Sequence, residues 1–443
     1  MTSGKHILLW LGAATGAILS ALVLYRPGAG PELTIGTVNN ADMILMQRLS
    51  SEFEKQSGIR LNWVVLGENV LRQRLTVDIA TGGNTFDVIT IGSYEAPLWG
   101  ARNWLVPVDD LGADYDYDDL FAVVRQGVSY KGKMYAAPFY AESSFTYYRK
   151  DLFEKAGLEM PEQPSYEQIR RFAARLHAPA HNVYGICLRG EPGWGQNMAY
   201  LGTLVYTFGG RWVDMKWQPQ LTTPPWVEAI RFYVDLLRNY GPPGASTNGH
   251  NENRALFANG NCAIWVDATS AAGYFLDPNQ SRVARTTGFA RAPIAKVPNG
   301  AAWAWSWALA IPRSSRHVRE AKQFLRWATG KQYVTLVGKR FGWVLAPPGT
   351  RKSTYENPAY LRAAPFARLV RDAILAADLT KPSALPVPYI GIQYMGIPEF
   401  QAIGTDVGQE VSAAFTGGET VERALQLAQT ETERELRRGG YLK

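Results

Sequence analysis

Polar and aromatic side chains that suit a ligand rich in hydroxyl groups recur where predicted strands end or where the chain is expected to cross between folding units. Carboxylate, amide and guanidinium groups bind hydroxyls in pairs, and an aromatic face covers carbon-bound hydrogens. The strongest predicted cluster is Arg189 with Glu142 and Asp267. The candidate ligand-binding residues are Asn40, Tyr94, Glu142, Arg189, Trp194, Asn253, Asp267, Trp303, Trp343, Tyr389 and Gln393.

A purely structural role explains some of these residues equally well. Asn40 also fits a helix cap, because it precedes a predicted helix. Glu142 and Arg189 also fit an ion pair between two lobes, and the aromatic rings of Trp343 and Tyr389 also fit a core. Both interpretations stay open from the sequence alone.

Alternating side-chain size predicts a strand over residues 303–311. Tryptophans at 303, 305 and 307 alternate with Ala or Ser, which is the period of two expected when successive side chains point to opposite faces. Pro312 ends the strand. We expect Trp303, nearest the strand start, to face a ligand and Trp307 to pack in the core, with Trp305 open to either role.

Strands and helices alternate along the first part of the chain. Apolar strands are predicted at 33–38, 59–66 and 86–91, separated by helices that begin near Asp42 and Glu68. This pattern indicates a parallel, doubly wound α/β sheet whose ligands bind beyond the carboxyl ends of the strands. Further along, Ser165 and Gln168 have the spacing of a capping box that opens a helix.

Several kinds of site are excluded or disfavoured. No glycine-rich phosphate loop follows the first strand, so no nucleotide cofactor is predicted. If the acidic run at 114–119 opened a calcium-binding loop, Arg125 would occupy its twelfth position, which excludes an EF-hand. The five histidines lack metal-ligand spacing and are interpreted as surface or turn residues, so no metal is predicted.

Charge and motif content narrow the function class. The formal net charge is +7, but the basic residues are spread along the chain without a basic run, so no nucleic acid partner is predicted. No nucleophile elbow or HExxH motif occurs. Glycoside hydrolysis needs only two suitably placed carboxyl groups, however, so a secreted carbohydrate-active hydrolase stays an alternative.

The N-terminus indicates export from the cytosol, and the state of the two cysteines is open. Residues 7–25 carry no charge and lie between Lys5 and Arg26, which indicates an export signal, either cleaved or retained as a membrane anchor. The two cysteines, Cys187 and Cys262, fit either a disulfide or two buried thiols.

Longer stretches of the chain carry a family resemblance. They include Tyr-Lys-Gly-Lys-Met-Tyr-Ala-Ala-Pro (130–138), Leu-Phe-Ala-Asn-Gly-Asn-Cys-Ala-Ile-Trp (256–265) and Leu-Ala-Ile-Pro (309–312). From residue 33 onward the chain resembles the extracellular solute-binding proteins of carbohydrate ABC importers, the family that includes maltose-binding protein. Stretches such as Thr-Val-Asn-Asn (37–40) and Trp-Val-Asp-Ala-Thr (265–269) resemble its mannitol- and sorbitol-binding branch.

The resemblance implies a type II-like periplasmic-binding-protein fold, in which two α/β lobes close on a ligand in the cleft between them. Three hinge crossings are then expected near 138–142, 266–268 and 342–346. The expected division is a signal peptide or anchor at 1–30, a first lobe from 31–138 and 267–342, and a second lobe from 139–266 and 343–443.

The function implied is capture of a polyol, without catalysis or a cofactor, and its delivery to the transmembrane permease subunits of an ABC importer. A disaccharide, a glycosyl-glycerol or a sulfonated sugar bound through Arg189 are alternative ligands. The resemblance further implies a monomer in the periplasm or another extracytoplasmic space, tethered to the inner membrane if the N-terminal segment is retained.

Overall fold

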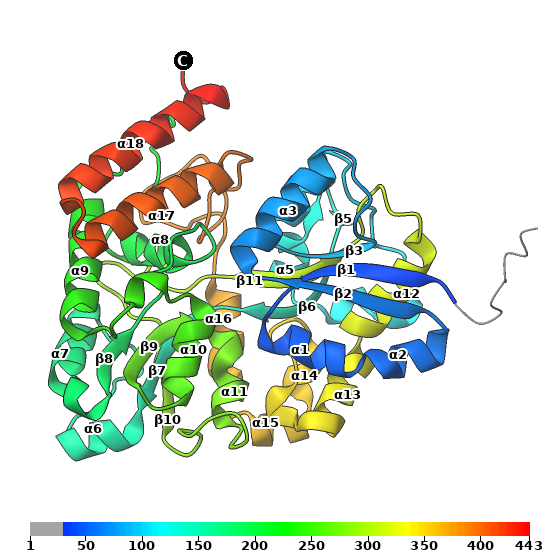
Figure 1. The fold of residues 1–443 in the computed structure, drawn as a ribbon, viewed down its shortest axis with the longest axis horizontal. Helices are drawn as coiled ribbons and strands as arrows, with labels where there is room; N and C mark the ends of the chain where they lie inside the picture. The colour runs from blue at the N-terminus through cyan, green and yellow to red at the C-terminus, as the bar shows by residue number, and fades with distance from the viewer. Residues whose placement is uncertain (1–29) are drawn as a thin grey trace, which may run out of the picture.

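Two separate β-sheets organise residues 30–443, the part of the chain that the computed structural model describes (Figure 1). One sheet has the order β2-β1-β3-β11-β6 and the other the order β10-β7-β9-β8. Helices cover both sheets, so each sheet is the centre of one lobe, and the predicted two-lobe α/β fold is confirmed. The predicted export signal lies almost wholly outside the described residues.

The first sheet begins as predicted. β1 (Glu32–Val38) pairs in parallel with β2 (Arg60–Leu66) and with β3 (Val88–Gly92), within two residues of the predicted strand bounds. β11 (Trp305–Ala310) inserts antiparallel between β3 and β6 (Ala137–Glu142). The first lobe also holds the small hairpin of β4 (Ser129–Tyr130) and β5 (Lys133–Met134).

Helices of the first lobe pack their apolar sides on this sheet and on one another. The ring centroid of Phe53 lies 5.3 Å from that of Phe324, in an edge-to-face pair, and 5.4 Å from that of Trp327, in a tilted pair, and these contacts join α2 to α12. The helices are α1 (Ala41–Arg48), α2 (Ser50–Ser57), α3 (Glu68–Ala80), α4 (Glu95–Ala101), α5 (Ala122–Gly127), α12 (Val318–Thr329) and α13 (Lys331–Phe341).

The second sheet has a central antiparallel pair, β7 (Ser144–Arg149) and β9 (Cys262–Ala268), flanked by β10 (Thr287–Arg291) and β8 (Tyr184–Cys187). Its helices are α6 (Lys150–Ala156), α7 (Tyr166–Leu176), α8 (Asn197–Thr207), α9 (Pro224–Tyr240), α10 (His250–Ala258) and α11 (Ala272–Leu276). The capping box at Ser165 and Gln168 opens α7, as predicted.

A disulfide joins Cys187 to Cys262, so the open choice between a disulfide and free thiols is decided. The bond links the neighbouring strands β8 and β9, whose Cα atoms at these positions lie 5.9 Å apart. Because it closes a loop of 75 residues, it stabilises the second lobe by an amount on the order of 4 kcal/mol in the chain-entropy model.

The crossings between lobes differ from the predicted ones. β6 runs to Glu142 in the first sheet and β7 begins at Ser144, so the first crossing lies at Ser143. The chain does not return after 266–268, because β10 pairs with β7 in the second sheet. The second crossing lies between Arg291 and Trp305, and the assignment of 267–291 to the first lobe is wrong.

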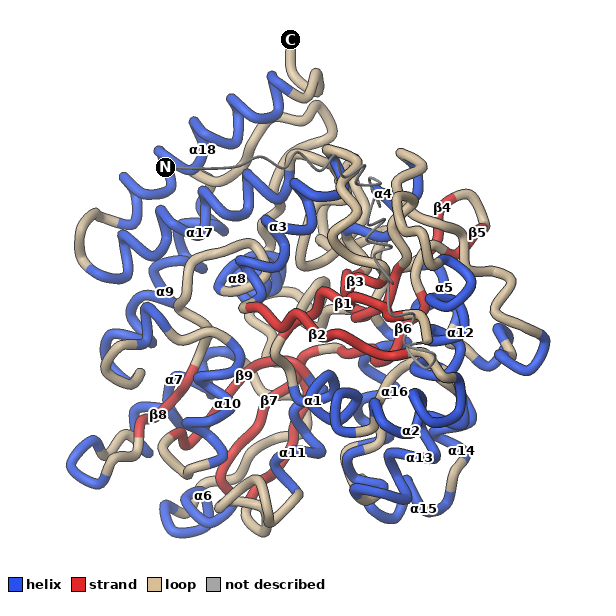
Figure 2. Tube along the Cα trace, turned by 45° about the vertical axis from the view of Figure 1, so that its right-hand side comes forward, coloured by secondary structure: helices blue, strands red, loops and turns tan. Residues whose placement is uncertain are grey.

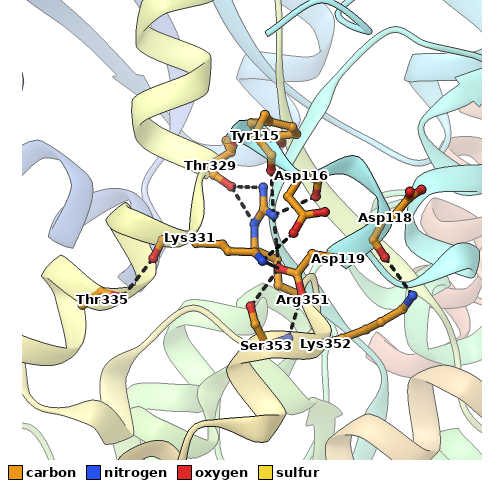
Figure 3. Close-up of polar contacts among 10 residues, drawn as sticks. All are labelled: Tyr115, Asp116, Asp118, Asp119, Thr329, Lys331, Thr335, Arg351, Lys352 and Ser353. Carbon is orange, nitrogen blue, oxygen red and sulfur yellow. Dashed lines mark hydrogen bonds and ion pairs between the residues drawn. The ribbon is translucent and has the colours of Figure 1, made fainter. Parts of the chain in front are cut away.

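The third crossing is also later than predicted, because Arg351 ties its segment to the first lobe (Figure 3). Its guanidinium, which has no exposed surface, donates to the backbone oxygens of Thr329 at 3.0 Å and Tyr115 at 3.0 Å, and to the carboxylate of Asp119 at 3.2 Å. The assignment of 343–351 to the second lobe is therefore wrong.

Beyond Arg351, the short helices α14 (Lys352–Glu356) and α15 (Pro358–Ala363) lie below the first lobe, and α16 (Ala367–Ala376) bridges β6 and β10 (Figure 1). The last two helices, α17 (Phe400–Thr416) and α18 (Val421–Arg438), lie side by side at one end of the second lobe against α8 and α9 (Figure 2). Among residues 30–443, no helix combines the length and apolarity needed to cross a membrane.

Candidate ligand-binding cleft

A cleft of about 230 Å³ lies between the two lobes. The first lobe lines it with residues that follow β1 and β2, as expected for the carboxyl ends of parallel strands, and with side chains from β6 and β11. The second lobe contributes the loop after β8, the start of α10 and the end of β9. The polar and aromatic lining residues are Asn39, Asn40, Glu68, Asn69, Arg72, Tyr140, Glu142, Arg189, Glu191, Trp194, Gln196, His250, Asn251, Glu252, Trp305, Trp307 and Gln393.

Direct hydrogen bonds between the lobes define a closed form. Asn69 of α3 donates to Glu191 Oε1 and to the backbone oxygen of Pro192, both at 3.3 Å. On the other side of the cleft, Asn251 of α10 donates to the backbone oxygen of Asn39 at 3.0 Å. A ligand in this cleft would therefore be enclosed by both lobes.

Three tryptophans and Arg72 form the aromatic part of the cleft. The guanidinium carbon of Arg72 lies 3.9 Å from the ring centroid of Trp194, 4.9 Å from Trp307 and 5.3 Å from Trp305. Ion pairs with Glu68, at 2.9 Å, and with Glu95 hold Arg72 in this position. The cluster offers apolar ring faces on a rigid support, which is what the carbon chain of a sugar-like ligand requires.

Gly92 of β3 makes room for one of these rings. A Cβ atom at Gly92 would overlap the indole of Trp305, which crosses the strand at this point. The absence of a side chain at Gly92 thus permits Trp305 to pack edge-to-face with Trp194, with the ring centroids 6.0 Å apart.

Arg189 and Asp267 form a buried ion pair under the second-lobe side of the cleft. Arg189 donates from Nε to Asp267 Oδ2 at 2.8 Å and from a terminal nitrogen to Oδ1 at 2.6 Å, and it also donates to the backbone oxygen of Gly195 at 2.8 Å. His250 contacts Asp267 Oδ1 at 2.9 Å. Burial by itself raises the pKa of Asp267, but Arg189 and His250 outweigh it and hold that pKa below its usual value.

Glu142 lies at the end of β6, is 5% exposed, and accepts a hydrogen bond from the hydroxyl of Ser270 at 2.6 Å. Burial, opposed by Ser270 and Arg189, raises the pKa of Glu142 to about 8. The carboxyl group is therefore largely protonated at neutral pH, and it then offers one O–H donor as well as an acceptor.

The raised pKa of Glu142 predicts a pH dependence of stability. Between about pH 4.5 and 8 the folded protein keeps a proton that the unfolded chain has lost, so the free energy of unfolding falls as pH rises, by up to about 1.4 kcal/mol per pH unit. Glu142→Gln should remove this contribution. Urea unfolding of the native protein and of Glu142→Gln from pH 5 to 8 measures the free energy of unfolding of each. If this free energy changes with pH in the same way in both proteins, the raised pKa assigned to Glu142 is contradicted.

Five of the eleven predicted site residues line the cleft: Asn40, Glu142, Arg189, Trp194 and Gln393. Asn40 also caps α1 through a bond from the backbone NH of Met43, so both interpretations of this residue hold structurally. Arg189 forms its ion pair with Asp267 of its own lobe, and not the interlobe pair with Glu142 that the sequence left as an alternative.

The other predicted residues do not reach the cleft surface. Tyr94 and Tyr389 are buried, with hydroxyl groups bonded to the backbone of Ile397 and to Tyr206 respectively. Asn253 and Asp267 have no exposed surface. Trp343 lies against Gly338 of α13, outside the cleft lining.

The prediction for the tryptophan strand is wrong in its assignment of rings. Trp303 has no exposed surface and does not line the cleft, whereas Trp305 and Trp307 do. The strand begins at Trp305, so Trp303 belongs to the crossing segment before it. Side-chain alternation correctly placed Trp305 and Trp307 on one face but could not say which face meets the other lobe.

Several lining residues were not predicted. Glu68 and Arg72 are four residues apart at the start of α3, directly after β2, so their position beyond a strand end was a usable signal. His250, interpreted as a surface or turn residue, instead lies in the cleft beside Asp267. Residues 30–443 contain no group of side chains suited to hold a metal ion.

Four buried polar atoms among the lining residues have no hydrogen-bond partner within the protein. They are Nε1 of Trp194, Oε1 of Gln196, Oδ1 of Asn251 and Oε1 of Gln393. Because buried polar groups are almost always hydrogen-bonded, these atoms point to a ligand or ordered water in the cleft.

Two α/β lobes, three crossings and a polar, aromatic cleft between them define a two-lobe solute-binding protein. Residues 40–335 match the family model for bacterial extracellular solute-binding proteins, and the chain belongs to this family. Its members act outside the cytoplasm as binding proteins rather than enzymes.

Relatives with known ligands narrow the comparison. The chain is 57% identical to a mannitol-binding protein of Pseudomonas aeruginosa over 97% of its own length and 99% of that protein. It is similar to an ABC transporter solute-binding protein of Agrobacterium vitis solved with D-mannitol, at a TM-score of 0.92 and 53% identity, covering 94% of this chain and 100% of that one. A ribitol complex from Agrobacterium radiobacter has a TM-score of 0.81 and 26% identity, covering 92% and 100%.

Proposed function

We propose that this protein binds mannitol or a closely related acyclic sugar alcohol in the interlobe cleft and delivers it to the permease of an ABC importer. Such a ligand has a hydroxyl on every carbon and no charge, so it needs paired donors and acceptors along an apolar surface. The unpartnered atoms of Trp194, Gln196 and Gln393 beside the tryptophan rings are the observation that carries the proposal. The 57% identity to a mannitol-binding protein supports it.

The geometry disfavours the alternative ligands. A sulfonated sugar needs a cation that is free to pair, but Arg189 is neutralised by Asp267, and Arg72 by Glu68 and Glu95. A cleft of about 230 Å³ favours a single six-carbon chain over a disaccharide.

A thermal-shift and calorimetry panel tests the ligand class. D-mannitol, D-sorbitol and ribitol should each raise the melting temperature, because saturation at 100 times Kd adds about 2.7 kcal/mol to the free energy of unfolding. Maltose and a 6-sulfonated glucose serve as the alternatives. Stabilisation by either of these, without stabilisation by any alditol, would overturn the proposal.

The absence of catalysis and the location are part of the same proposal. A binding protein should release no product from aryl glycosides above a buffer blank, whereas steady turnover would indicate a hydrolase. We propose that the protein works in the periplasm, either free or held by residues 7–25. N-terminal sequencing of the exported protein distinguishes the free form from the anchored form, since a start at Met1 requires a retained anchor.

A further inference from the structure

A cluster of hydrogen-bond acceptors lies on the second-lobe side of the cleft around Gly249, the residue before α10. Glu191 Oε2 and Gln196 Oε1 lie 2.5 and 2.7 Å from the point where a Cβ atom on Gly249 would stand. Glu252 Oε2 accepts the backbone NH of Gly249 at 3.0 Å. Glu191, Gln196 and Glu252 all line the cleft, so two segments of the chain bring three acceptor side chains to one place.

The carboxylates of this cluster form no salt bridge within the described residues. Within residues 30–443, Glu191 and Glu252 take part in no salt bridge, and Glu191 receives only the neutral amide of Asn69, at 3.3 Å. Gln196 is 7% exposed and its Oε1 has no hydrogen-bond partner. Burial, together with the charges of Glu252 and Glu68, raises the pKa of Glu191 and outweighs the opposing charge of Arg189.

The two guanidinium groups of the cleft do not compensate for this charge. Arg72 is held by two carboxylates, Glu68 and Glu95, and Arg189 is held by Asp267 through two hydrogen bonds. The end of the cleft around Gly249 therefore offers acceptors and negative charge to whatever part of a ligand reaches it.

We propose that the acceptors of Glu191, Gln196 and Glu252 form a subsite for a protonated amino group, so that the protein also binds amino sugar alcohols and rejects sugar acids of the same chain length. An ammonium group has three N–H donors and no acceptor, which matches a site made of acceptors. A ligand carboxylate at the same place meets the like charge of Glu191 and Glu252. This inference rests on the proposed function, because the remaining carbons must occupy the cleft as a polyol does.

Three ligands that differ only at one terminal carbon test the subsite: D-mannitol, 1-amino-1-deoxy-D-mannitol and D-mannonate. In isothermal titration at pH 7, the amino compound should bind within tenfold of mannitol or more tightly, and mannonate at least 100-fold more weakly than the amino compound. In the double variant Glu191→Gln/Glu252→Gln, the ratio of the Kd of mannonate to the Kd of the amino compound should fall at least tenfold. Glu159→Gln is the matched control, because it removes an exposed carboxylate of the second lobe outside the cleft lining, and it should leave the ratio unchanged.

The outcomes separate this inference from the proposed function. Equal affinities for the amino compound and mannonate, with mannitol bound, would overturn the charged subsite and leave the polyol proposal standing. A ratio that the double variant does not alter would also overturn it. If the amino compound binds and mannitol does not, the subsite stands and the polyol proposal falls, and failure of all three ligands to bind overturns both.

Discussion

Replacing Arg189 by Met should weaken mannitol binding at least 100-fold, a loss of about 2.7 kcal/mol. The substitution keeps much of the apolar stem but leaves Asp267, which has no exposed surface, without its cation. It also frees the backbone oxygen of Gly195, which Arg189 holds at 2.8 Å, and with it the loop that carries Trp194 and Gln196. Isothermal titration calorimetry measures the change.

Arg149 provides a closely matched control for this prediction. It makes the same set of contacts in the same lobe, with two hydrogen bonds to Asp151, at 2.8 and 2.5 Å, and one to the backbone oxygen of Gly260 at 3.0 Å, but it does not line the cleft. Arg149→Met should keep mannitol affinity within threefold of the native protein. If Arg189→Met and Arg149→Met bind mannitol with equal affinity, the ion pair of Arg189 with Asp267 has no part in binding.

Replacing Arg351 by Met should lower the free energy of unfolding by about 3–5 kcal/mol, the usual cost of removing one partner of a buried ion pair. Arg351 has no exposed surface, and its loss removes the buried cation partner of Asp119 and the side-chain donor to the backbone oxygens of Thr329 and Tyr115 (Figure 3). Urea unfolding followed by circular dichroism measures the loss.

The neighbouring Lys352 is the control for this prediction. It donates to the backbone oxygen of Asp118 at 2.8 Å from an exposed position, so Lys352→Ala should change the free energy of unfolding by less than about 0.5 kcal/mol. Because the Arg351 contacts anchor the last crossing to the first lobe, a loss below about 1 kcal/mol would contradict the anchoring role assigned to them.

Local patterns predicted local structure well. The strands expected at 33–38, 59–66 and 86–91 formed as β1, β2 and β3, and the spacing of Ser165 and Gln168 produced a capping box at α7. Both signals depend on residues a few positions apart, whose periodicity and hydrogen bonds act within one element. The family and its fold were predicted correctly for a related reason, since long matching stretches specify a known arrangement.

Contacts between distant residues limited the prediction of the site. Arg189 and Asp267 are 78 positions apart. Nothing in the sequence around either residue shows that Arg189 pairs with Asp267 rather than with Glu142. The placement of β10 beside β7 likewise depends on a pairing across more than 130 residues, and it moved the second crossing from 266–268 to the segment before Trp305.

By itself, the sequence determined the α/β lobes, the family, and the kinds of side chain available to a hydroxyl-rich ligand. Only the tertiary structure decided which of them line the cleft, placing Trp305 and Trp307 there and burying Trp303. The physical reason is that alternation fixes which side chains share a face, whereas sheet order and lobe closure fix what that face meets. The same long-range contacts decided that Asp267 pairs with Arg189, while Glu191 and Glu252 line the cleft without a salt bridge among the described residues.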